Sequence, residues 1–462
     1  MTVITFGTSG WRAVLAEDFT FANARRVVEA IAGVLKEDGK AGGLVLVGCD
    51  TRFLADRFAA DAARVLAGAG FAAEVGSRPV PTPVLAFEIR RRGAVGAVNF
   101  TASHNPPQYL GIKFSTHDGA PALPDVTRRI EERIAQISEV AAPAESLVSA
   151  FDPVPAYLAD LSVKLDAAEV ARGKPHFSLD FRYGTSVGFL DAFLESAGTE
   201  IFRLNANRDP LFGGLSPQCG EKELSVLSEE VRRRGSRLGL SCDGDADRFG
   251  VLDDTGAYVQ PNEILALLAN DLLGRKGRRG GLARSVATTH ALDAIAVKFG
   301  VPLYETPVGF KYIGEKLIAG EIILGGEESA GLTVQGHVPE KDGILADLLV
   351  AEMVGASGKK LGELSADLAA QIGPFLTRRL DVKVSPEAKQ ALARRRASPP
   401  ETFAGRKVAS VNLLDGLKLL LSDGCWILVR ESGTEPVARL YVEAHSVTDL
   451  DALAAAGPEL LA

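Results

Sequence analysis

Strand-like and helix-like stretches alternate along the first three quarters of this 462-residue chain, and this alternation constrains the fold more than any other feature. Residues 44–48 have the unbroken apolar character of a buried strand. Before them, apolar residues recur at helical spacing between Val27 and Leu35, and Gly39 provides a stop for that helix. Because such alternation is typical of βαβ units, we expect an α/β fold with mixed, largely parallel sheets.

Three such sets follow one another, and a different C-terminal part ends the chain. The second set starts near residues 176–181 and has a further strand candidate at residues 237–241. The third begins near Pro261 and has strand candidates at residues 285–289 and 321–324. The similar order of strand, helix and strand predicts three related α/β units.

The C-terminal part is expected to be a small α+β domain. Residues 380–384 and 439–443 alternate apolar and polar residues as half-exposed strands do. Residues 386–396 fit a helix whose basic run forms a solvated face. Because the chain is too long for one core, we expect four domains, at residues 1–150, 151–255, 256–372 and 373–462.

Bulk composition argues against several classes of partner. The net charge of −8 gives no reason to expect nucleic acid or an anionic membrane surface. The four cysteines are far apart, so they signal neither a zinc site nor a disulfide framework, and scattered thiols suit a reducing cytosol. The N-terminus does not resemble a signal peptide. We therefore expect a cytoplasmic protein. The sequence leaves both a monomer and a homodimer open.

The stretch Thr-Ala-Ser-His-Asn-Pro-Pro at residues 101–107 follows a small, apolar strand candidate at residues 94–100. Its two prolines cannot continue a strand or helix, so Ser103 should lie in a sharp loop at the carboxyl end of a strand, where ligands bind in open α/β sheets. A serine placed there could carry a phosphoryl group, and His104 could move a proton. A polar turn that contains both by chance is the alternative.

Asp243, Asp245 and Asp247 alternate with small residues after another strand candidate. The small residues allow three carboxylates to converge on one hard cation, and oxygen-only ligation suits Mg²⁺. An acidic turn is the alternative, although crowded carboxylates repel one another unless something neutralises them. An EF-hand does not fit, because its glycine is misplaced and residues 249–252 look like a continuing strand.

Two further loops fit the recognition of a sugar phosphate. Residues 325–331 combine adjacent glutamates, a serine and glycines, which suits sugar hydroxyls but also suits a surface turn. Residues 430–436 combine an arginine, hydroxyls and a glycine, which suits an anion cradle or a β-turn with a surface arginine. Arg12, Lys113 and Lys341 could add positive charge, or could be surface cations.

Together these loops favour a reaction on a substrate with two ends. One phosphate would be anchored remotely while a hydroxyl approaches phosphorylated Ser103, and transfer would give a bisphosphorylated intermediate. If that intermediate turns end over end, the other phosphate can return to Ser103. A phosphatase would gain little from the remote anchor, and a non-catalytic binding protein would be expected to lose Ser103 or one of the aspartates.

The chain resembles the α-D-phosphohexomutase superfamily, of the phosphoglucomutase/phosphomannomutase type, over essentially its whole length. Five motifs occur in that family's order, at residues 6–10, 101–107, 243–248, 326–331 and 430–436. The resemblance implies three related α/β domains and a C-terminal domain of helices on an antiparallel sheet, arranged around a central cleft. It also implies a hexose phosphate as the substrate.

The resemblance implies a role for each matching residue. Ser103 is the phosphorylated residue, and one Mg²⁺ per chain is held by Ser103, Asp243, Asp245 and Asp247. The cations that stabilise the transferring phosphoryl group are Arg12, Lys113 and Arg248. His104 and Lys341 are candidates for proton transfer or sugar contact. Glu327 and Ser329 grip sugar hydroxyls, and the other phosphate is held by Arg430, Ser432, Gly433 and Thr434.

The sugar loop suggests glucose. Its third residue is Glu328, as in phosphoglucomutases, whereas phosphomannomutase-like enzymes usually have Met there and phosphoglucosamine enzymes Gln. Residues 340–343 and 306–311 fit the same group. We therefore expect interconversion of glucose 1-phosphate and glucose 6-phosphate, with glucose 1,6-bisphosphate as activator. The compact chain also resembles dual-specificity enzymes, so a phosphomannomutase or dual activity stays open.

Overall fold

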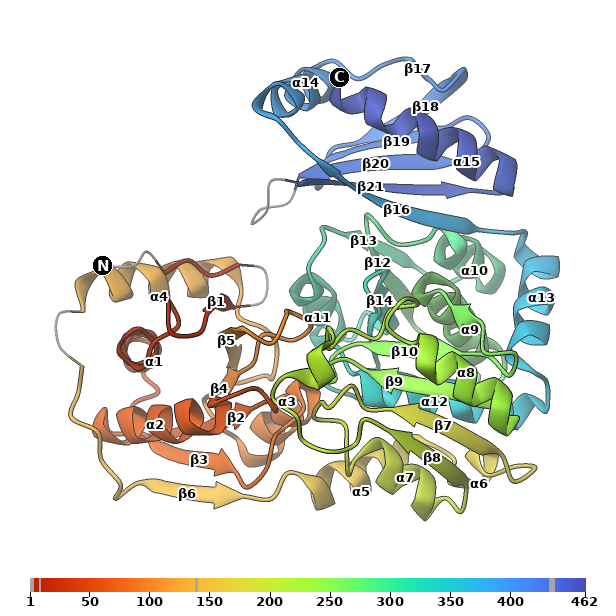
Figure 1. Ribbon diagram of the computed structural model, residues 1–462. Helices are drawn as coiled ribbons and strands as arrows, with labels where there is room; N and C mark the ends of the chain where they lie inside the picture. The colour runs from red at the N-terminus through yellow and green to blue at the C-terminus, as the bar shows by residue number, and fades with distance from the viewer. Residues whose placement is uncertain (1–3, 8–9, 138–139, 432–436) are drawn as a thin grey trace. The chain divides into compact units, whose positions relative to one another are not determined.

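The computed structural model describes residues 4–7, 10–137, 140–431 and 437–462 (Figure 1). The chain divides into two compact units. The first unit comprises Met1–Pro261, Gly314–Gly320 and Ser329–Leu361. The second comprises Asn262–Ile313, Glu321–Glu328 and Gly362–Ala462.

The first unit opens with a six-stranded sheet in the order β1-β5-β4-β2-β3-β6. Strands β4, β2, β3 and β6 are parallel, whereas β5 is antiparallel to both β4 and β1. The elements of this part are β1 (Trp11–Val14), α1 (Phe21–Glu37), β2 (Leu44–Cys49), α2 (Ala55–Gly68), β3 (Ala72–Gly76), α3 (Thr82–Arg92), β4 (Gly96–Phe100), β5 (Tyr109–Thr116), α4 (Pro124–Gln136) and β6 (Val148–Phe151).

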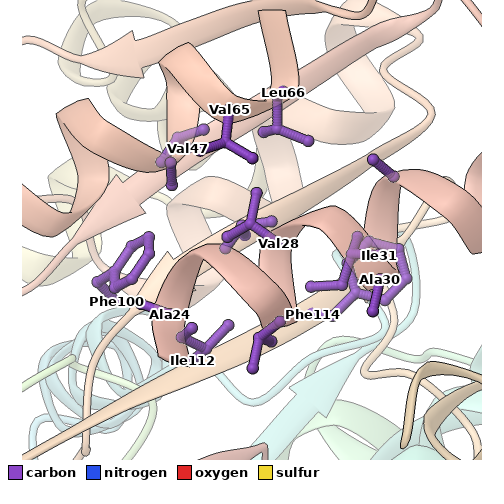
Figure 2. Close-up of a cluster of buried hydrophobic side chains, with 14 of the residues drawn as sticks. Ala24, Val28, Ala30, Ile31, Val47, Val65, Leu66, Phe100, Ile112 and Phe114 are labelled. Atoms are coloured by element: carbon purple, nitrogen blue, oxygen red, sulfur yellow. The ribbon is translucent and has the colours of Figure 1, made fainter. Parts of the chain in front are cut away.

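Helix α1 forms where the apolar spacing predicts it. The Thr20 side chain accepts a hydrogen bond from the backbone N–H of Asn23 and caps the start of the helix. After the helix, Gly39 takes a φ of 70°, which favours glycine. Figure 2 shows Val28 of α1 in a cluster with side chains of α2, β2, β4 and β5. This core fixes the strands whose ends carry the candidate serine loop.

A second sheet has the order β11-β10-β9-β7-β8. Its strands β9, β7 and β8 are parallel, and β10 returns antiparallel to β9. The elements are α5 (Val154–Lys164), α6 (Ala167–Val170), β7 (His176–Asp180), α7 (Leu190–Ser196), β8 (Glu200–Leu204), η1 (Phe212–Gly214), α8 (Ser225–Arg234), β9 (Leu238–Cys242), β10 (Phe249–Leu252) and β11 (Tyr258–Val259). The first unit also contains β15 (Gly331–Val334) and the buried helix α12 (Gly343–Ser357).

In the third set, β14, β12 and β13 pair in parallel in that order. Its elements are α9 (Pro261–Gly274), β12 (Gly281–Ser285), α10 (Ala291–Phe299), β13 (Leu303–Thr306), α11 (Phe310–Ile318), β14 (Ile322–Glu327) and α13 (Leu361–Ile372). The strand expected at residues 285–289 is wrong, because β12 ends at Ser285 and a turn follows. Val286 and Ala287 do not belong to a strand. These apolar side chains are buried because they pack against Trp426.

The C-terminal part is an antiparallel sheet in the order β16-β21-β20-β19-β18-β17, with α14 and α15 packed on it (Figure 1, blue). The elements are β16 (Leu376–Lys383), α14 (Pro386–Ala397), β17 (Thr402–Phe403), β18 (Arg406–Asn412), β19 (Leu417–Leu421), β20 (Trp426–Glu431), β21 (Val437–Ala444), α15 (Val447–Ala456) and η2 (Gly457–Leu461). The expected α+β part is confirmed.

The three α/β sheets share one strand order. In each, the first three parallel strands lie in the order third, first, second, as β4-β2-β3, β9-β7-β8 and β14-β12-β13, and the first sheet adds β6 as a fourth parallel strand. This repeated order confirms the expected α/β class with mixed, largely parallel sheets. Within the described ranges, no helix is both long and apolar enough to cross a lipid bilayer.

Candidate active site

The serine loop starts where β4 ends. Ser103 is 1% exposed and has a φ of 51°, a left-handed conformation that is uncommon for a residue other than glycine. Its backbone N–H donates to the Thr101 hydroxyl at 2.9 Å. The sharp loop predicted at the carboxyl end of a strand is therefore present, and it fixes the direction of the Ser103 hydroxyl.

The carboxylate loop follows β9 in the neighbouring sheet of the same unit. Asp243, Asp245 and Asp247 are buried, and each offers an oxygen within 4.8 Å of the others. Ala246 has a φ of 58°, which lets the loop fold back so that the carboxylates converge. Ser103 Oγ donates to Asp243 Oδ2 at 2.8 Å, so two loops that lie 140 residues apart in the sequence meet here.

The donor set of this cage fits Mg²⁺, which prefers oxygen ligands. Oδ1 of Asp245 and Oδ1 of Asp247 are buried and have no hydrogen-bond partner among the described residues. A buried carboxylate oxygen without a partner is unfavourable. These two oxygens are therefore well suited to bind a cation, and Asp243 and the Ser103 hydroxyl lie beside them.

Two buried lysines partly neutralise the cage. Lys113 Nζ donates to Asp245 at 2.6 Å and to Asp247 at 2.9 Å, and Lys341 Nζ lies 3.2 Å from Asp247. Burial alone would raise the pKa of Asp247, but Lys113, Lys341 and Arg248 together lower it well below its usual range. Burial and the neighbouring carboxylates raise the pKa of Asp243 well above its usual range. The carboxylate next to Ser103 is thus the one that most needs compensating charge.

Arg12 and Arg248 bring further positive charge to the serine loop. Arg12 Nη1 donates to Asn105 Oδ1 at 2.7 Å, and the Arg248 backbone N–H donates to Asp243 Oδ1 at 3.2 Å. His104 Nδ1 lies 3.3 Å from Ser103 Oγ. The charge of Arg248, burial and the charge of Arg12 lower the pKa of His104 well below its usual value, so the imidazole is neutral beside the hydroxyl.

Sequence reasoning missed three polar residues that support this site. Thr82 Oγ1 donates to Asp245 Oδ2 at 2.7 Å, Asn105 receives the Arg12 bond, and Glu340 binds Lys341 Nζ at 3.1 Å. Asn105 and Glu340 lie inside or next to motifs, so their positions were a usable signal. Thr82 begins α3, and nothing in its local sequence points to the carboxylate cage.

Helix α12 begins directly against the carboxylate loop. The Gly343 N–H donates to the Ala246 carbonyl at 3.0 Å, and the Asp342 side chain caps the helix through the N–H of Leu345 at 2.9 Å. A Cβ at Gly343 would lie 2.3 Å from the Arg248 carbonyl oxygen. Only glycine therefore allows this helix to approach the loop so closely.

Gly343→Ala is expected to displace the carboxylate loop. We expect a loss of about 1–3 kcal/mol in the free energy of unfolding and weaker Mg²⁺ binding, measured by denaturant unfolding and by calorimetric titration. Gly358→Ala is the control at the C-cap of the same helix, because Gly358 has a φ of 70° and open space around its Cβ position. It should lose about 1 kcal/mol and bind Mg²⁺ as before. Identical Mg²⁺ binding in both variants would contradict the steric argument.

The expected sugar loop lies at the end of β14 in the second unit. Glu327 is buried, and its Oε1 accepts a hydrogen bond from the Gly309 N–H at 2.7 Å. Glu328 Oε2 accepts from the hydroxyls of Ser285 at 3.1 Å and Thr288 at 3.2 Å. Ser329, the next residue, is half-buried and is grouped with the first unit.

Arg430 lies near the end of β20 in the second unit. Its Nε is 2.9 Å from Asp415 Oδ1, and Asp415 Oδ2 accepts a hydrogen bond from the Val308 N–H at 3.0 Å. The other residues of the expected phosphate loop, Ser432, Gly433 and Thr434, lie outside the described residues. The structure thus brings together Arg12, Ser103, His104, Lys113, Asp243, Asp245, Asp247, Arg248 and Lys341 in the first unit, and it describes Glu327 and Arg430 in the second.

Comparisons with known proteins agree with this picture. Four phosphoglucomutase/phosphomannomutase family profiles match in order: alpha/beta/alpha domain I over residues 3–141, domain II over 155–256, domain III over 260–372 and the C-terminal domain over 382–456. A phosphoglucomutase/phosphomannomutase of Thermococcus kodakarensis is 30% identical over 449 residues, which cover 96% of this chain and 94% of the relative.

Two further proteins are similar along almost their whole length. A probable phosphoglucosamine mutase of Pyrococcus horikoshii is 30% identical over 448 residues, covering 96% of this chain and 94% of that protein. The crystal structure of a putative phosphomannomutase from Thermus thermophilus matches with a TM-score of 0.88 and 36% identity, covering 100% of this chain and 99% of the other. These relatives are named for different sugars.

The fold and the site define a class of enzyme, the isomerases that move a phosphoryl group within a sugar phosphate. This chain belongs to the phosphoglucomutase/phosphomannomutase family of the α-D-phosphohexomutase superfamily. The resemblance carried by the five motifs is confirmed.

Proposed function

We propose that the chain is a phosphoglucomutase that interconverts glucose 1-phosphate and glucose 6-phosphate through phosphorylated Ser103 and a glucose 1,6-bisphosphate intermediate. The observation that supports phosphoryl transfer at Ser103 is its hydrogen bond of 2.8 Å from Oγ to Asp243 Oδ2. This bond lies inside a buried cage of three carboxylates. A serine held beside an oxygen-rich cation site is placed to carry a phosphoryl group.

Ser103, Asp243, Asp245 and Asp247 would hold one Mg²⁺. When bound, Mg²⁺ would neutralise charge on the phosphoryl group and so reduce its repulsion of an incoming hydroxyl. Oδ1 of Asp245 and Oδ1 of Asp247 support this assignment, because both are buried without a hydrogen-bond partner among the described residues.

The protein's own cations would stabilise the group in transfer. Lys113 is already buried against the cage, and Arg12 and Arg248 place two permanent charges close to it. His104 and Lys341 are the two candidates for moving the proton of the sugar hydroxyl. His104 is the nearer to the serine, with its Nδ1 3.3 Å from Ser103 Oγ.

The remaining loops would recognise the rest of the substrate. We assign Glu327 and Ser329 to the sugar hydroxyls, and Arg430 with the loop at residues 432–434 to the phosphate that is not being transferred. A remote anchor of this kind distinguishes a mutase from a phosphatase, because the bisphosphate has to be retained while it turns.

Glu328 supports glucose as the sugar. Its carboxylate accepts two hydroxyl hydrogen bonds, from Ser285 and Thr288, and its backbone N–H donates to the Thr288 hydroxyl at 3.1 Å. A methionine there could not accept the two side-chain bonds. The conformation of this sugar loop is therefore tied to the residue that is typical of phosphoglucomutases. A phosphomannomutase or dual-specificity enzyme is the second candidate, because the named relatives include both activities.

A mutase assay with Mg²⁺ and a trace of glucose 1,6-bisphosphate tests the substrate. We expect glucose 1-phosphate to be converted at least about tenfold more efficiently than mannose 1-phosphate, a difference of the size that pocket contacts provide. Glu328→Met should reduce this ratio, whereas Glu328→Gln, which keeps one acceptor, should preserve most of it. Equal rates on both sugars would assign a dual-specificity enzyme, and conversion of glucosamine phosphate alone would overturn the glucose assignment.

The domain division and cellular setting are part of the same proposal. The division into domains at residues 1–150, 151–255, 256–372 and 373–462 is supported by the separate sheets of the four parts. We propose a cytoplasmic enzyme, acting as a monomer or homodimer on small hexose phosphates.

A further inference from the structure

A buried ion pair outside the five motifs lies directly beneath the serine loop. Asp50 and Arg52 follow β2, and both are 0% exposed. The Arg52 backbone N–H donates to Asp50 Oδ1 at 2.9 Å, and Arg52 Nε donates to Asp50 Oδ2 at 3.0 Å. A buried charge pair is expensive to form unless its remaining donors and acceptors are satisfied.

The remaining donors of Arg52 point to the serine loop and to the first residue of β5. An arginine side chain has five N–H donors in a fixed planar arrangement, and here every one has an acceptor. Besides Asp50, the acceptors are the backbone carbonyls of Ser103 at 2.7 Å, Asn105 at 2.6 Å, Pro106 at 2.8 Å and Tyr109 at 3.0 Å. The Phe212 ring covers the guanidinium, with its centroid 5.0 Å from Cζ.

Asp50 reaches the same loop by a second route. Its Oδ2 accepts a hydrogen bond from Thr101 Oγ1 at 2.7 Å, and Thr101 Oγ1 in turn accepts one from the Ser103 N–H at 2.9 Å. The Ser103 peptide is therefore held at its N–H through Thr101 and at its carbonyl through Arg52. These two restraints act on the one residue of the loop that has an unfavourable φ of 51°.

The second sheet has a similar Asp–Arg pair, whose guanidinium binds other carbonyls. After β7, the Arg182 N–H donates to Asp180 Oδ1 at 2.9 Å, as Arg52 does to Asp50. The Arg182 guanidinium donates to the carbonyls of Ser216 and Glu223, and its Nε has no hydrogen-bond partner among the described residues. Full use of the guanidinium thus distinguishes the arginine beneath the serine loop.

We propose that Asp50 and Arg52 are positioning residues for phosphoryl transfer, which hold Ser103 in the strained conformation that aims its hydroxyl at the carboxylate cage. This proposal rests on the proposed function of Ser103. We call Asp50 and Arg52, with their hydrogen bonds to the serine loop, the clamp. Without the clamp, the loop would relax toward an ordinary backbone conformation and the hydroxyl would leave its place beside Asp243. The sugar-binding residues would be unaffected, so the effect should fall on the chemical step.

Arg52→Lys tests the clamp, because lysine keeps the charge but has three donors on one nitrogen and cannot span the carbonyls. We expect kcat to fall about 100-fold, as for a small misplacement of a reacting group, with KM changed less than about threefold. Phosphorylation of Ser103 by glucose 1,6-bisphosphate, followed by intact mass, should slow equally. Backbone amides of residues 101–109 should exchange hydrogen faster.

Val28→Ala is the matched control for stability. Val28 is fully buried in the core of the same sheet, and its truncation should destabilise the fold without touching the serine loop. This variant should keep kcat within about twofold at a temperature where it is folded, and should keep the amide protection of residues 101–109. If Arg52→Lys kept kcat within about threefold of the wild type, or lost it no more than Val28→Ala, the clamp would be refuted.

Thr101 variants provide a second test of the proposal if Arg52→Lys does not fold. Thr101→Val removes the hydroxyl between Asp50 and the Ser103 N–H and should lower kcat about tenfold, the loss expected for roughly 1.4 kcal/mol. Thr101→Ser should recover most of this loss, and equal activity of the valine variant and the wild type would count against the clamp. A wild type that converts no sugar phosphate would overturn the proposed function instead. The amide exchange of residues 101–109 would still decide whether the clamp orders the loop.

Discussion

Ser103→Ala is expected to abolish mutase activity while leaving the fold intact. If Ser103 carries the phosphoryl group, its loss removes the covalent route, and activity should fall by at least about 10⁴-fold, since nucleophile removal in covalent enzymes costs this much or more. Alanine and serine both have a Cβ, so the left-handed φ strains both residues similarly. The substitution removes the hydrogen bond to Asp243 and the contact of 3.3 Å with His104 Nδ1, which should change stability by about 1 kcal/mol.

Two measurements separate this expectation from a general loss of function. The intact mass of the wild type should increase by one phosphoryl group after incubation with glucose 1,6-bisphosphate, and that of Ser103→Ala should not. Ser162→Ala is the matched control, because the Ser162 hydroxyl is exposed and bonds only to the Leu158 carbonyl of its own helix among the described contacts. A Ser103→Ala protein that still transfers phosphate would place the covalent residue elsewhere or remove it from the mechanism.

Asp245→Asn is expected to have the second largest effect. Asp245 accepts hydrogen bonds from Thr82 and Lys113 through one oxygen, and its other oxygen is buried without a partner among the described residues. Loss of its charge should weaken Mg²⁺ binding and lower kcat by about 10²–10³-fold, the range found when one electrostatic stabiliser is removed. Calorimetric titration of the dephosphorylated protein measures the Mg²⁺ affinity independently of activity.

The control for this variant is Asp254→Asn, which removes a carboxylate that pairs with Lys360 outside the cage. It should bind Mg²⁺ as the wild type does. Chelation followed by return of Mg²⁺ should restore wild-type activity fully, and Asp245→Asn activity only at a higher Mg²⁺ concentration. Unchanged Mg²⁺ affinity in Asp245→Asn would mean that the metal is held by other residues.

Local sequence patterns predicted those parts of the fold whose causes are local. The apolar spacing from Val27 to Leu35 reflects one buried face of α1, and the apolar run at residues 44–48 reflects a strand buried on both faces. The same reasoning misplaced β12. Val286 and Ala287 are buried, but against Trp426, which lies far along the chain, and not within a strand. Apolar character shows that a residue is buried, but not what buries it.

The candidate site shows the same limit. Ser103 and the three aspartates were recognisable because each loop has an unusual composition of its own. The two loops meet at Ser103 and Asp243, which lie 140 residues apart in the sequence. Their meeting follows from the packing of two sheets, and it was predicted from the combined chemistry of the loops and from the resemblance, not from any local pattern. Arg52 was missed because its side chain donates to backbone carbonyls. Any residue provides such a carbonyl, so no sequence motif marks the contact. Thr82 was missed for a similar reason. Only its hydrogen bond to Asp245 in the structure shows its role, and nothing in the local sequence marks it.

The repeated strand order has a consequence for how such a chain can change over time. The third parallel strand of each sheet, β4, β9 and β14, ends in the loop with the serine, the carboxylates or the glutamates, respectively. One position of the scaffold, present three times, thus carries three different sets of side chains. Under the proposed function, a mutation in the loop after β14 would retune the choice of sugar and leave untouched the loops assigned to the phosphoryl group and the cation. A family built this way would be expected to diversify its substrates far more readily than its chemistry.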